Sequence, residues 1–359
     1  MFNQVKVKMQ RDYANFYLGQ SYMQAFGLLD PALVNSSYEK VVFLKELDAF
    51  GFADFLDVGR YWMKQGTLLT FANGNLSKEK ALELSNLAKD VFALKTQGLE
   101  HIAQIRSVQI KAHQLVRIQV ELLNPEDENS ASVLFFQDPT FEGTDIKTKM
   151  LNELLRDYLD EPTFNNLRTE QQLGYVVFTL LRGFRDVNGI GFLVQSTVQP
   201  AAYLSERILD NLDRVRANLT HISQDEFKVK VQATKTRLAV KDTKLEQQNA
   251  RFWTEIITQR SIFDRQDQNL AMLDTLTSQE LIAFFEEKFY TNPRILEVNV
   301  VSQKQKENQA NILKEKMEPI YKSRNLNVLN VGDQSLTKFK SQMMLHPDPF
   351  KNFFGDVRL

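Results

Sequence analysis

The stretch from Phe164 to Phe178, FNNLRTEQQLGYVVF, changes from helix to strand and constrains this chain more than any other segment. The part that ends at Arg168 has the pattern of a helix, and the part that begins at Tyr175 has the pattern of a strand. Gly174 lies at the corner between them, and glycine suits a corner because it adopts backbone angles that other residues resist. We therefore expect the side chains of Arg168 and Tyr175 to reach one place.

Arg168 and Tyr175 together have the chemistry to hold a peptide carbonyl group. The guanidinium of arginine is a permanently charged fork of N–H donors, and the phenol of tyrosine stays protonated at neutral pH and donates its O–H. Two converging donors hold and polarise a carbonyl oxygen. The alternative is structural: a solvated arginine and a half-buried tyrosine, because long charged side chains mostly face water.

Composition places the chain among ordinary globular proteins. Its 359 residues suffice for about two domains of roughly 150 residues each. The sequence is 43% hydrophobic and 25% charged, and its net charge is −1. A nucleic-acid-binding protein usually carries a strongly basic face, so we expect no nucleic-acid partner.

The same composition bears on location and on redox chemistry. The chain has no cysteine, so it has neither a disulfide nor a thiolate ligand for a metal. No apolar run approaches the roughly 20 residues of a membrane-spanning helix, and the first residues lack the apolar core of a secretory signal. We therefore expect a cytoplasmic protein with no membrane partner.

The order of predicted elements indicates an α+β fold. Residues 2–95 read as helices with one strand at Leu68–Phe71. Later strands are predicted near residues 116–122, 132–137, 174–182, 190–198 and 295–301. A helix is predicted from Ile146 to Leu159, and four more follow the fourth of these strands, two of them opened by the capping boxes Ser223/Glu226 and Thr277/Glu280. Paired strands followed by runs of helices are typical of α+β proteins.

The segment Leu167-Arg168-Thr169-Glu170-Gln171-Gln172-Leu173-Gly174-Tyr175 resembles the LRT-x-EQLGY-x-V segment of the insulin-degrading enzyme family of zinc peptidases, the inverzincins, with pitrilysin and nardilysin. Ile190 to Ser196, IGFLVQS, resembles the family as well. The resemblance covers most of the chain. It implies two homologous domains of antiparallel-rich sheet packed with helices. Residues 1–105 would be a partial third domain, truncated at its N-terminus, residues 106–302 the fourth domain, and residues 303–359 a C-terminal tail.

The resemblance also implies roles for three residues. Arg168 would bind a substrate carbonyl near the scissile bond, and Tyr175 would donate to the oxyanion as it forms. Phe164, one helical turn before Arg168, would line the wall beside the peptide. A simple core role is the alternative for Phe164.

The zinc site of the family is absent from this sequence. That site is His-x-x-Glu-His with a distant glutamate. The four histidines, His101, His113, His221 and His346, are followed by IAQI, QLVR, ISQD and PDPF, so neither orientation of the motif can be built. A zinc ion shared by His101 and His113 is the alternative that we disfavour. We therefore expect no metal in this chain and zinc in an N-terminal half that this chain lacks.

The resulting hypothesis is the C-terminal, substrate-binding half of an insulin-degrading-enzyme-like zinc metalloendopeptidase. Its expected partners are peptide substrates and the zinc-binding half, in the same or in a separate chain. An incomplete first domain would leave an apolar edge or face uncovered, which favours homo-oligomers. The alternative is a non-catalytic interaction or assembly subunit derived from such a peptidase.

Overall fold

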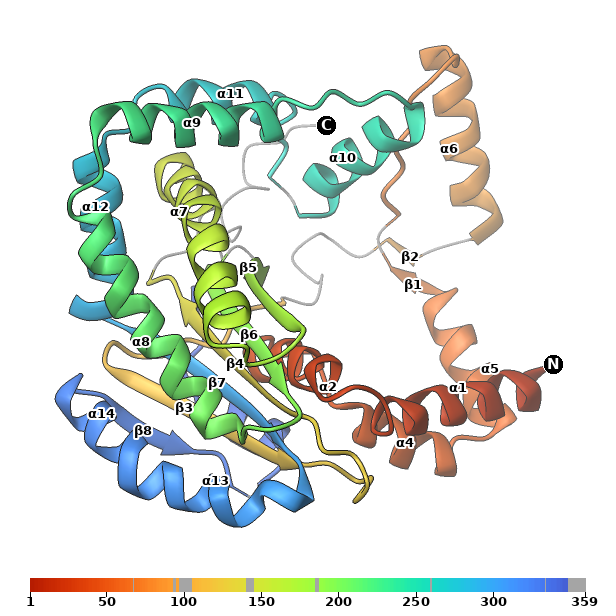
Figure 1. Cartoon of the computed structure of the whole chain (residues 1–359). Helices are drawn as coiled ribbons and strands as arrows, with labels where there is room; N and C mark the ends of the chain where they lie inside the picture. Colours follow the sequence, from red (N-terminus) through yellow and green to blue (C-terminus); the bar gives the residue numbers. More distant parts are fainter. Residues whose placement is uncertain are drawn as a thin grey trace.

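A six-stranded mixed sheet forms the centre of the molecule (Figure 1), in the order β5-β6-β4-β7-β3-β8. The computed structural model describes residues 1–66, 68–92, 95–96, 105–139, 145–184, 187–258, 260–332 and 334–347. The pairs β5/β6, β6/β4 and β4/β7 are antiparallel, and the pairs β7/β3 and β3/β8 are parallel. The strands are β3 (Gln114–Glu121), β4 (Ser130–Gln137), β5 (Val176–Phe184), β6 (Val187–Ser196), β7 (Arg294–Val301) and β8 (Asn327–Asn330). The predicted α+β class is confirmed.

Strand β4 shows why the sheet is covered on both sides. All eight of its residues are buried. Successive side chains of a strand point to opposite faces. Leu134 and Phe136 accordingly pack into one apolar cluster, while Val133 and Phe135 pack into another. A strand that is apolar at successive positions is stable only between two covered faces.

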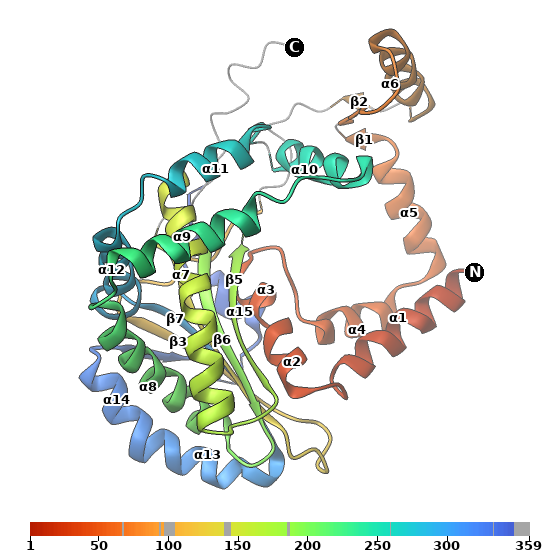
Figure 2. The ribbon, with the colours of Figure 1, turned by 45° about the horizontal axis from the view of Figure 1, so that its top comes forward.

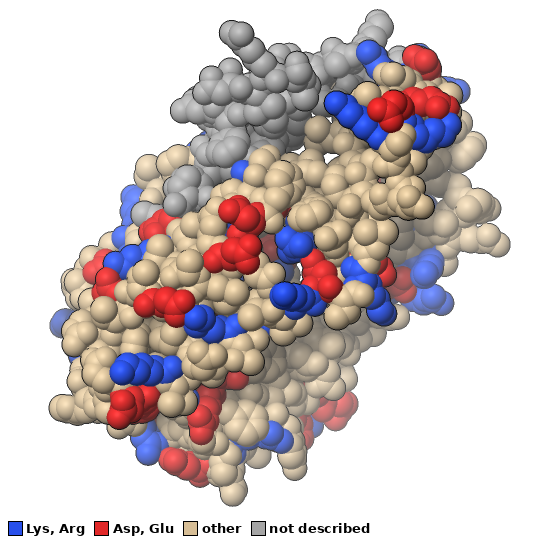
Figure 3. All heavy atoms as spheres, turned by 90° about the horizontal axis from the view of Figure 1, so that it is seen from above, with Lys and Arg blue, Asp and Glu red and all other residues tan. Residues whose placement is uncertain are grey.

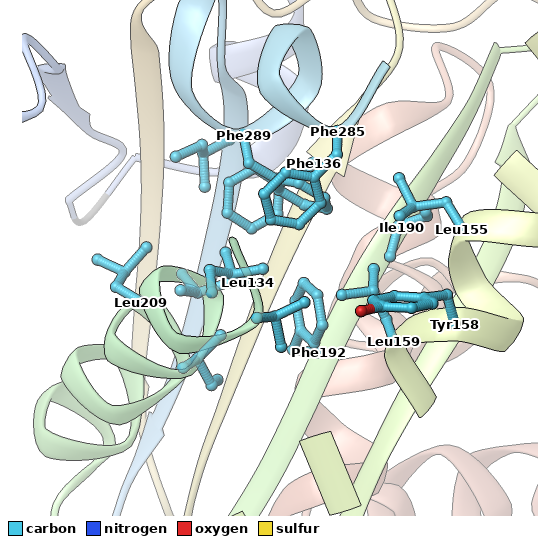
Figure 4. Packing of buried hydrophobic residues seen from close by; sticks show 14 of the residues in the cluster. Leu134, Phe136, Leu155, Tyr158, Leu159, Ile190, Phe192, Leu209, Phe285 and Phe289 are labelled. Carbon is cyan, nitrogen blue, oxygen red and sulfur yellow. The ribbon is translucent and has the colours of Figure 1, made fainter. Parts of the chain in front are cut away.

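The larger cluster lies under α7 (Ile146–Phe164), α8 (Ala201–Leu219) and α12 (Ser278–Glu286). Helix α7 buries the predicted apolar face from Met150 to Leu159. Aromatic rings fill the centre of this cluster (Figure 4), where Phe136 meets Phe289 edge to face with 4.7 Å between ring centroids. Helices α9 (Gln224–Leu238) and α11 (Arg265–Leu273) pack against α7, and α10 (Leu245–Ile257) connects them in the chain. The predicted cap of α9 by Ser223 and the capping box of α12 are confirmed.

The opposite face of the sheet is covered by elements from both ends of the chain. Helices α2 (Ser21–Gly27) and α3 (Leu29–Leu33) pack there with α15 (Leu336–Ser341), as Figure 2 shows. Phe339 of α15 is 2% exposed. Phe339 therefore belongs to the apolar cluster on this face of the sheet.

Residues beyond 302 also extend the sheet itself. Strand β8 pairs in parallel with β3. The helical segments there are η4 (Gln303–Gln305), α13 (Lys306–Ile312), the π-helical turn η5 (Leu313–Met317) and α14 (Glu318–Ser323). The segment predicted as a tail thus contributes to the central fold up to residue 347.

Strand β3 is more buried than its alternating sequence predicts. Arg117 alternates with apolar residues along this strand, yet it is 9% exposed and pairs with the fully buried Glu297 of β7 at 2.7 Å. The hydroxyl of Tyr321 also donates to Glu297. Because α14 covers this side of the sheet, the charge of Arg117 is buried and paired instead of being solvated.

The N-terminal helices form an arm beside the sheet (Figure 2). They are α1 (Phe2–Phe16), α4 (Lys40–Ala49), α5 (Phe52–Trp62) and α6 (Lys78–Phe92). None of their residues is buried. The strand predicted at Leu68–Phe71 is wrong, because no described strand pairs with these residues; β1 (Gln65–Gly66) and β2 (Lys95–Thr96) form a short parallel pair instead.

Neither the helices nor the face seen in Figure 3 carries a signal for a membrane or a polyanion in the part of the chain that the structure describes. Over the described ranges, no helix combines the length and the apolar character needed to cross a membrane. On the face seen in Figure 3, basic and acidic side chains are interspersed.

Candidate functional site

The segment from Phe164 to Val176 turns the end of α7 into the start of β5. Pro162 lies inside α7. Proline cannot donate the usual helical hydrogen bond, and the helix continues after it as the π-helical turn η2 (Asn165–Glu170). π-Helical turns are rare and often occur at functional sites. Arg168 lies in η2, and Tyr175 immediately precedes β5.

The corner forms where it was predicted, but glycine is needed there for a different physical reason. The residue with left-handed backbone angles is Gln172, with a φ of 52°, and not Gly174. Gly174 is required by a close approach instead: an added Cβ would lie 1.9 Å from the carbonyl oxygen of Gln195. The corner therefore docks against the end of β6, where no side chain at residue 174 fits.

A buried polar network holds η2 in place. Asn166 is 5% exposed, and its Nδ2 donates to Oδ1 of Asn211 at 2.8 Å. Asn211 in turn donates to the hydroxyl of Thr163. Oδ1 of Asn166 accepts hydrogen bonds from Arg214 and from Gln171. Helix α8 thereby fixes the turn that carries Arg168.

Arg168 and Tyr175 line the same hollow, whose volume is about 530 Å³. The other lining residues are Asn129, Gln172, Leu173, Gly174, Gln195, Thr197 and Val198. The hollow lies at the end of the sheet where β4 begins and β6 ends. The two predicted donors therefore reach one place, as the corner required.

Phe164 lies under the guanidinium of Arg168. The Cζ atom of Arg168 is 4.7 Å from the centroid of the Phe164 ring. Phe164 is 37% exposed. It is therefore not a core residue. Its ring stacks against the guanidinium of Arg168 and does not line the hollow.

Both donors are available to a ligand. Tyr175 is 91% exposed. Within the described ranges, neither the guanidinium of Arg168 nor the hydroxyl of Tyr175 makes a hydrogen bond or an ion pair, although Arg168 stacks on Phe164. A peptide carbonyl or a carboxylate is the kind of acceptor that such a pair holds.

Sequence reasoning did not identify Gln195 as part of the site, although it lies in the segment Ile190 to Ser196. Its Oε1 accepts from the hydroxyl of Ser21 at 2.8 Å and from the backbone N–H of Tyr22. Gln195 thus joins the first residues of α2 to the hollow. The signal that could have identified Gln195 as a site residue is a polar glutamine next to the end of an apolar strand.

Metal ligands do not gather in the described part of the chain. There, no three histidine, aspartate or glutamate side chains lie close enough to hold a metal ion. His346 is 3% exposed and lies 3.5 Å from Oε1 of Gln137. His101, weighed above as a ligand beside His113, lies outside the described residues. The described residues therefore do not fit a zinc site.

Comparison with known proteins gives three kinds of similarity. Residues 154–253 match the family described as PQQ synthase PqqF-like, C-terminal lobe domain 4. Human insulin-degrading enzyme is 30% identical over 239 residues, which are 64% of this chain and 22% of that protein. A nardilysin-like protein of Arabidopsis thaliana is 27% identical over 293 residues, 80% of this chain and 28% of its own length.

Among solved structures, pitrilysin superposes with a TM-score of 0.76 at 19% identity, over 96% of this chain and 35% of that one. This likeness shows a shared fold. The chain spans less than a third of the length of the two sequence relatives.

Proposed function

Because this chain belongs to the insulinase/pitrilysin/nardilysin peptidase family and resembles its C-terminal lobe, we propose that it is the substrate-binding half of a zinc metalloendopeptidase that acts on peptides. The observation that carries the proposal is the common hollow of Arg168 and Tyr175, in which both donors lack a protein partner among the described residues.

The role of each residue follows from its chemistry. The planar fork of Arg168, supported by the ring of Phe164, holds the carbonyl of a substrate peptide. The hydroxyl of Tyr175 donates to the carbonyl oxygen as it becomes an oxyanion, where a well-placed donor stabilises the transition state. The zinc ion that activates water in this family would be supplied by the other half, since the described residues do not fit it.

Two further features are part of this proposal. Residues 1–105 would be a partial third domain and residues 106–302 a fourth domain of the same ancestry. Helices α1, α4, α5 and α6, which bury none of their own residues, would be covered by the zinc-binding half. Trp62, 72% exposed on α5, is the kind of large aromatic side chain that anchors protein interfaces.

The same exposed arm also favours the second candidate function, a non-catalytic subunit that assembles with a partner. Phe52, at the start of α5, and Met63, directly after its end, are also more than half exposed. An assembly subunit needs this surface but has no need for two unpaired donors in a hollow. Peptide binding at Arg168 and Tyr175 therefore distinguishes the two candidates.

The test measures binding of reduced and alkylated insulin B chain, labelled with fluorescein, to the purified 359-residue chain by fluorescence anisotropy. The double variant Arg168→Ala/Tyr175→Ala should bind at least tenfold more weakly. The matched control is Arg60→Ala/Tyr61→Ala on α5, which removes the same two exposed residue types elsewhere. Equal binding by the wild type and both variants, with unchanged folding by circular dichroism, would favour the assembly subunit.

A second measurement tests whether zinc binding and peptide cleavage require the zinc-binding half. The chain alone should hold no stoichiometric zinc by metal analysis and should cleave no peptide. Cleavage that a chelator abolishes should appear only when a polypeptide with the His-x-x-Glu-His site is added. One tight zinc per isolated chain, together with chelator-sensitive cleavage, would contradict the proposal.

A further inference from the structure

A second hollow, of about 440 Å³, lies at the other end of the sheet from Arg168 and Tyr175. It is found where β4 ends and where the parallel strands β7, β3 and β8 begin. The hollow of Arg168 and Tyr175 lies where β4 begins, and the eight residues of β4 span about 25 Å. A small ligand in this distal hollow therefore does not reach the first one.

The floor of the distal hollow is apolar and buried. It is lined by Phe136 of β4, Leu209 of α8 and Phe289 of the π-helical turn η3 (Glu287–Thr291), each at most 2% exposed. All three belong to the larger apolar cluster and are labelled in Figure 4. Sites for small molecules typically have a volume of about 300–1,000 Å³ and an apolar lining with a few placed polar groups. The floor has the apolar part of such a site.

His113 contributes a polar atom without a partner to this hollow. Its ring atom Nδ1 is buried and makes no hydrogen bond to any described residue. Buried polar atoms usually have a partner, because leaving them unpaired is costly. The imidazole is thus prepared for a hydrogen bond with a ligand.

The backbone holds His113 in an unusual conformation at this place. Its N–H donates to the carbonyl oxygen of Pro293, and its own carbonyl oxygen accepts from the N–H of Asn327, so that it joins the starts of β3, β7 and β8. Its φ of 58° lies in the left-handed region, which is uncommon for a residue other than glycine. Residues held in such conformations concentrate at ligand-binding sites.

Arg324, directly after α14, contributes charged donors to the same hollow. Its Nη2 donates to both carboxylate oxygens of Asp213 at 2.7 Å, and the hydroxyl of Tyr290 donates to Asp213 as well. The Cζ atom of Arg324 lies 5.2 Å from the centroid of the Tyr290 ring. Asp213 is therefore compensated and holds the guanidinium in place. Among the described residues, Nε and Nη1 of Arg324 have no hydrogen-bond partner.

We propose that the distal hollow binds a small aromatic carboxylate. The ring of the ligand packs on Phe136 and Phe289, where aromatic contacts are favourable. Its carboxylate accepts charge-assisted hydrogen bonds from the free donors of Arg324. His113, in the tautomer that carries its proton on Nδ1, donates to the same group. This site goes beyond the proposed function, because peptide binding at Arg168 and Tyr175 makes no use of it.

The first test compares an acid with its neutral amide on the full 359-residue chain. The probes are 2-naphthylacetate and 2-naphthylacetamide, which share the ring and differ in charge. NMR titration, followed on the ring protons of the probe, gives the Kd. The amide should bind at least tenfold more weakly, because it offers Arg324 no anionic acceptor. Equal Kd values, or no saturable binding of the acid, would overturn the proposal.

The second test removes the two donors and keeps the backbone. His113→Asn should bind the acid about tenfold more weakly without a fall in Tm, because asparagine tolerates left-handed angles and the lost Nδ1 has no partner in the protein. His221→Asn, at an exposed histidine after α8, is the control and should bind as the wild type does.

Arg324→Lys should bind the acid several-fold more weakly although it keeps a cation beside Asp213. One ammonium group cannot replace the separate donors of the guanidinium. Arg251→Lys on α10 is the control and should leave the Kd unchanged. If His113→Asn and Arg324→Lys both bind the acid as the wild type does, these residues do not form the site and the proposal is wrong.

The third test locates the bound probe. Ser323→Trp places a large side chain in the distal hollow and should abolish binding of the acid. Ser341→Trp is a close control, because both serines are exposed, end a short helix and donate to the carbonyl oxygen three residues earlier. Unchanged binding by Ser323→Trp would place the probe elsewhere and contradict the proposal.

The double variant Arg168→Ala/Tyr175→Ala separates this inference from the proposed function. It should bind 2-naphthylacetate with the Kd of the wild type, whatever its effect on peptide binding. Loss of the probe in this variant would assign the acid to the first hollow and overturn the inference.

Discussion

A Cβ atom added to Gly174 would lie 1.9 Å from the carbonyl oxygen of Gln195. This approach joins the corner before β5 to the end of β6 and places the donors of the hollow next to the sheet. Because a backbone carbonyl oxygen cannot move without its strand, the corner cannot shift relative to the end of β6.

Gly174→Ala should therefore destabilise the protein by about 1–3 kcal/mol, the range of overpacked sites, and should weaken peptide binding as well. The free energy of unfolding in urea measures the first effect. Gly59→Ala in α5 is the control, because no atom lies within 4 Å of its added Cβ. A helical glycine replaced by alanine should leave stability unchanged or raise it by about 0.5–1 kcal/mol. Equal stability of Gly174→Ala and the wild type would show that the corner is not held by this contact.

Tyr175→Phe should lower kcat in a complex that restores the zinc-binding half. Loss of one oxyanion donor typically costs about 10²–10³ in kcat, on the order of 3–4 kcal/mol. The Tm should not change, because Tyr175 is 91% exposed. Tyr203→Phe, on α8 and outside the hollow, should keep normal turnover. A normal kcat for a well-folded Tyr175→Phe complex would exclude the oxyanion role.

Arg168→Lys should weaken peptide binding and turnover although it keeps the positive charge. Lysine lacks the planar fork that stacks on the ring of Phe164 and offers two parallel donors. Kd values from anisotropy for Arg168→Lys and for Arg60→Lys on α5 make the comparison. If both variants bind as the wild type does, Arg168 acts only as a surface charge.

Asn166→Ala should destabilise the protein by about 1–3 kcal/mol, because it leaves Oδ1 of the buried Asn211 without its donor and leaves Arg214 with Glu170 as its remaining acceptor. Peptide binding should also fall, since η2 carries Arg168. The control is Asn218→Ala at the exposed end of α8. Full binding by a destabilised Asn166→Ala protein would show that the network supports the fold but does not position Arg168.

The free energy of unfolding should decrease as the pH falls from about 6.5 toward 4, because His346 is buried in the folded protein. Burial, with the nearby charges of Arg294 and Arg106, lowers the pKa of His346 to about 4. The unfolded chain, with an ordinary histidine pKa near 6.5, then binds more protons than the folded one in this window, so acid favours unfolding. The full effect is about 3 kcal/mol. Urea unfolding at pH 7, 6, 5 and 4.5 should show a flatter profile for His346→Gln; parallel profiles would contradict the assignment.

Much of the fold was predictable from local pattern. The apolar face of α7, the caps at Ser223 and Thr277 and the strands β4, β6 and β7 followed from periodicity and from capping chemistry. These features depend on residues near one another in the sequence. The corner between Arg168 and Tyr175 was predictable for the same reason, as was the use of glycine there, although the reason for the glycine was not.

Features that depend on partners far away in the sequence were not predictable. The strand expected at Leu68–Phe71 did not form because a strand needs a partner, and local propensity cannot supply one. Arg117 is buried against Glu297, 180 residues later, because α14 closes that side of the sheet, and no residue near Arg117 in the sequence indicates this pairing.

The sequence by itself determined the α+β class, the turn that brings Arg168 and Tyr175 together, and the absence of the His-x-x-Glu-His motif. Each of these features depends only on neighbouring residues and their spacing. Only the tertiary structure decided that Gly174 meets Gln195, that Asn166 is held from α8, and that β5 lies at an open edge of the sheet. These relationships join segments that are tens of residues apart, and they exist only when the packing of helices on the sheet fixes which strands are neighbours and which edge stays free.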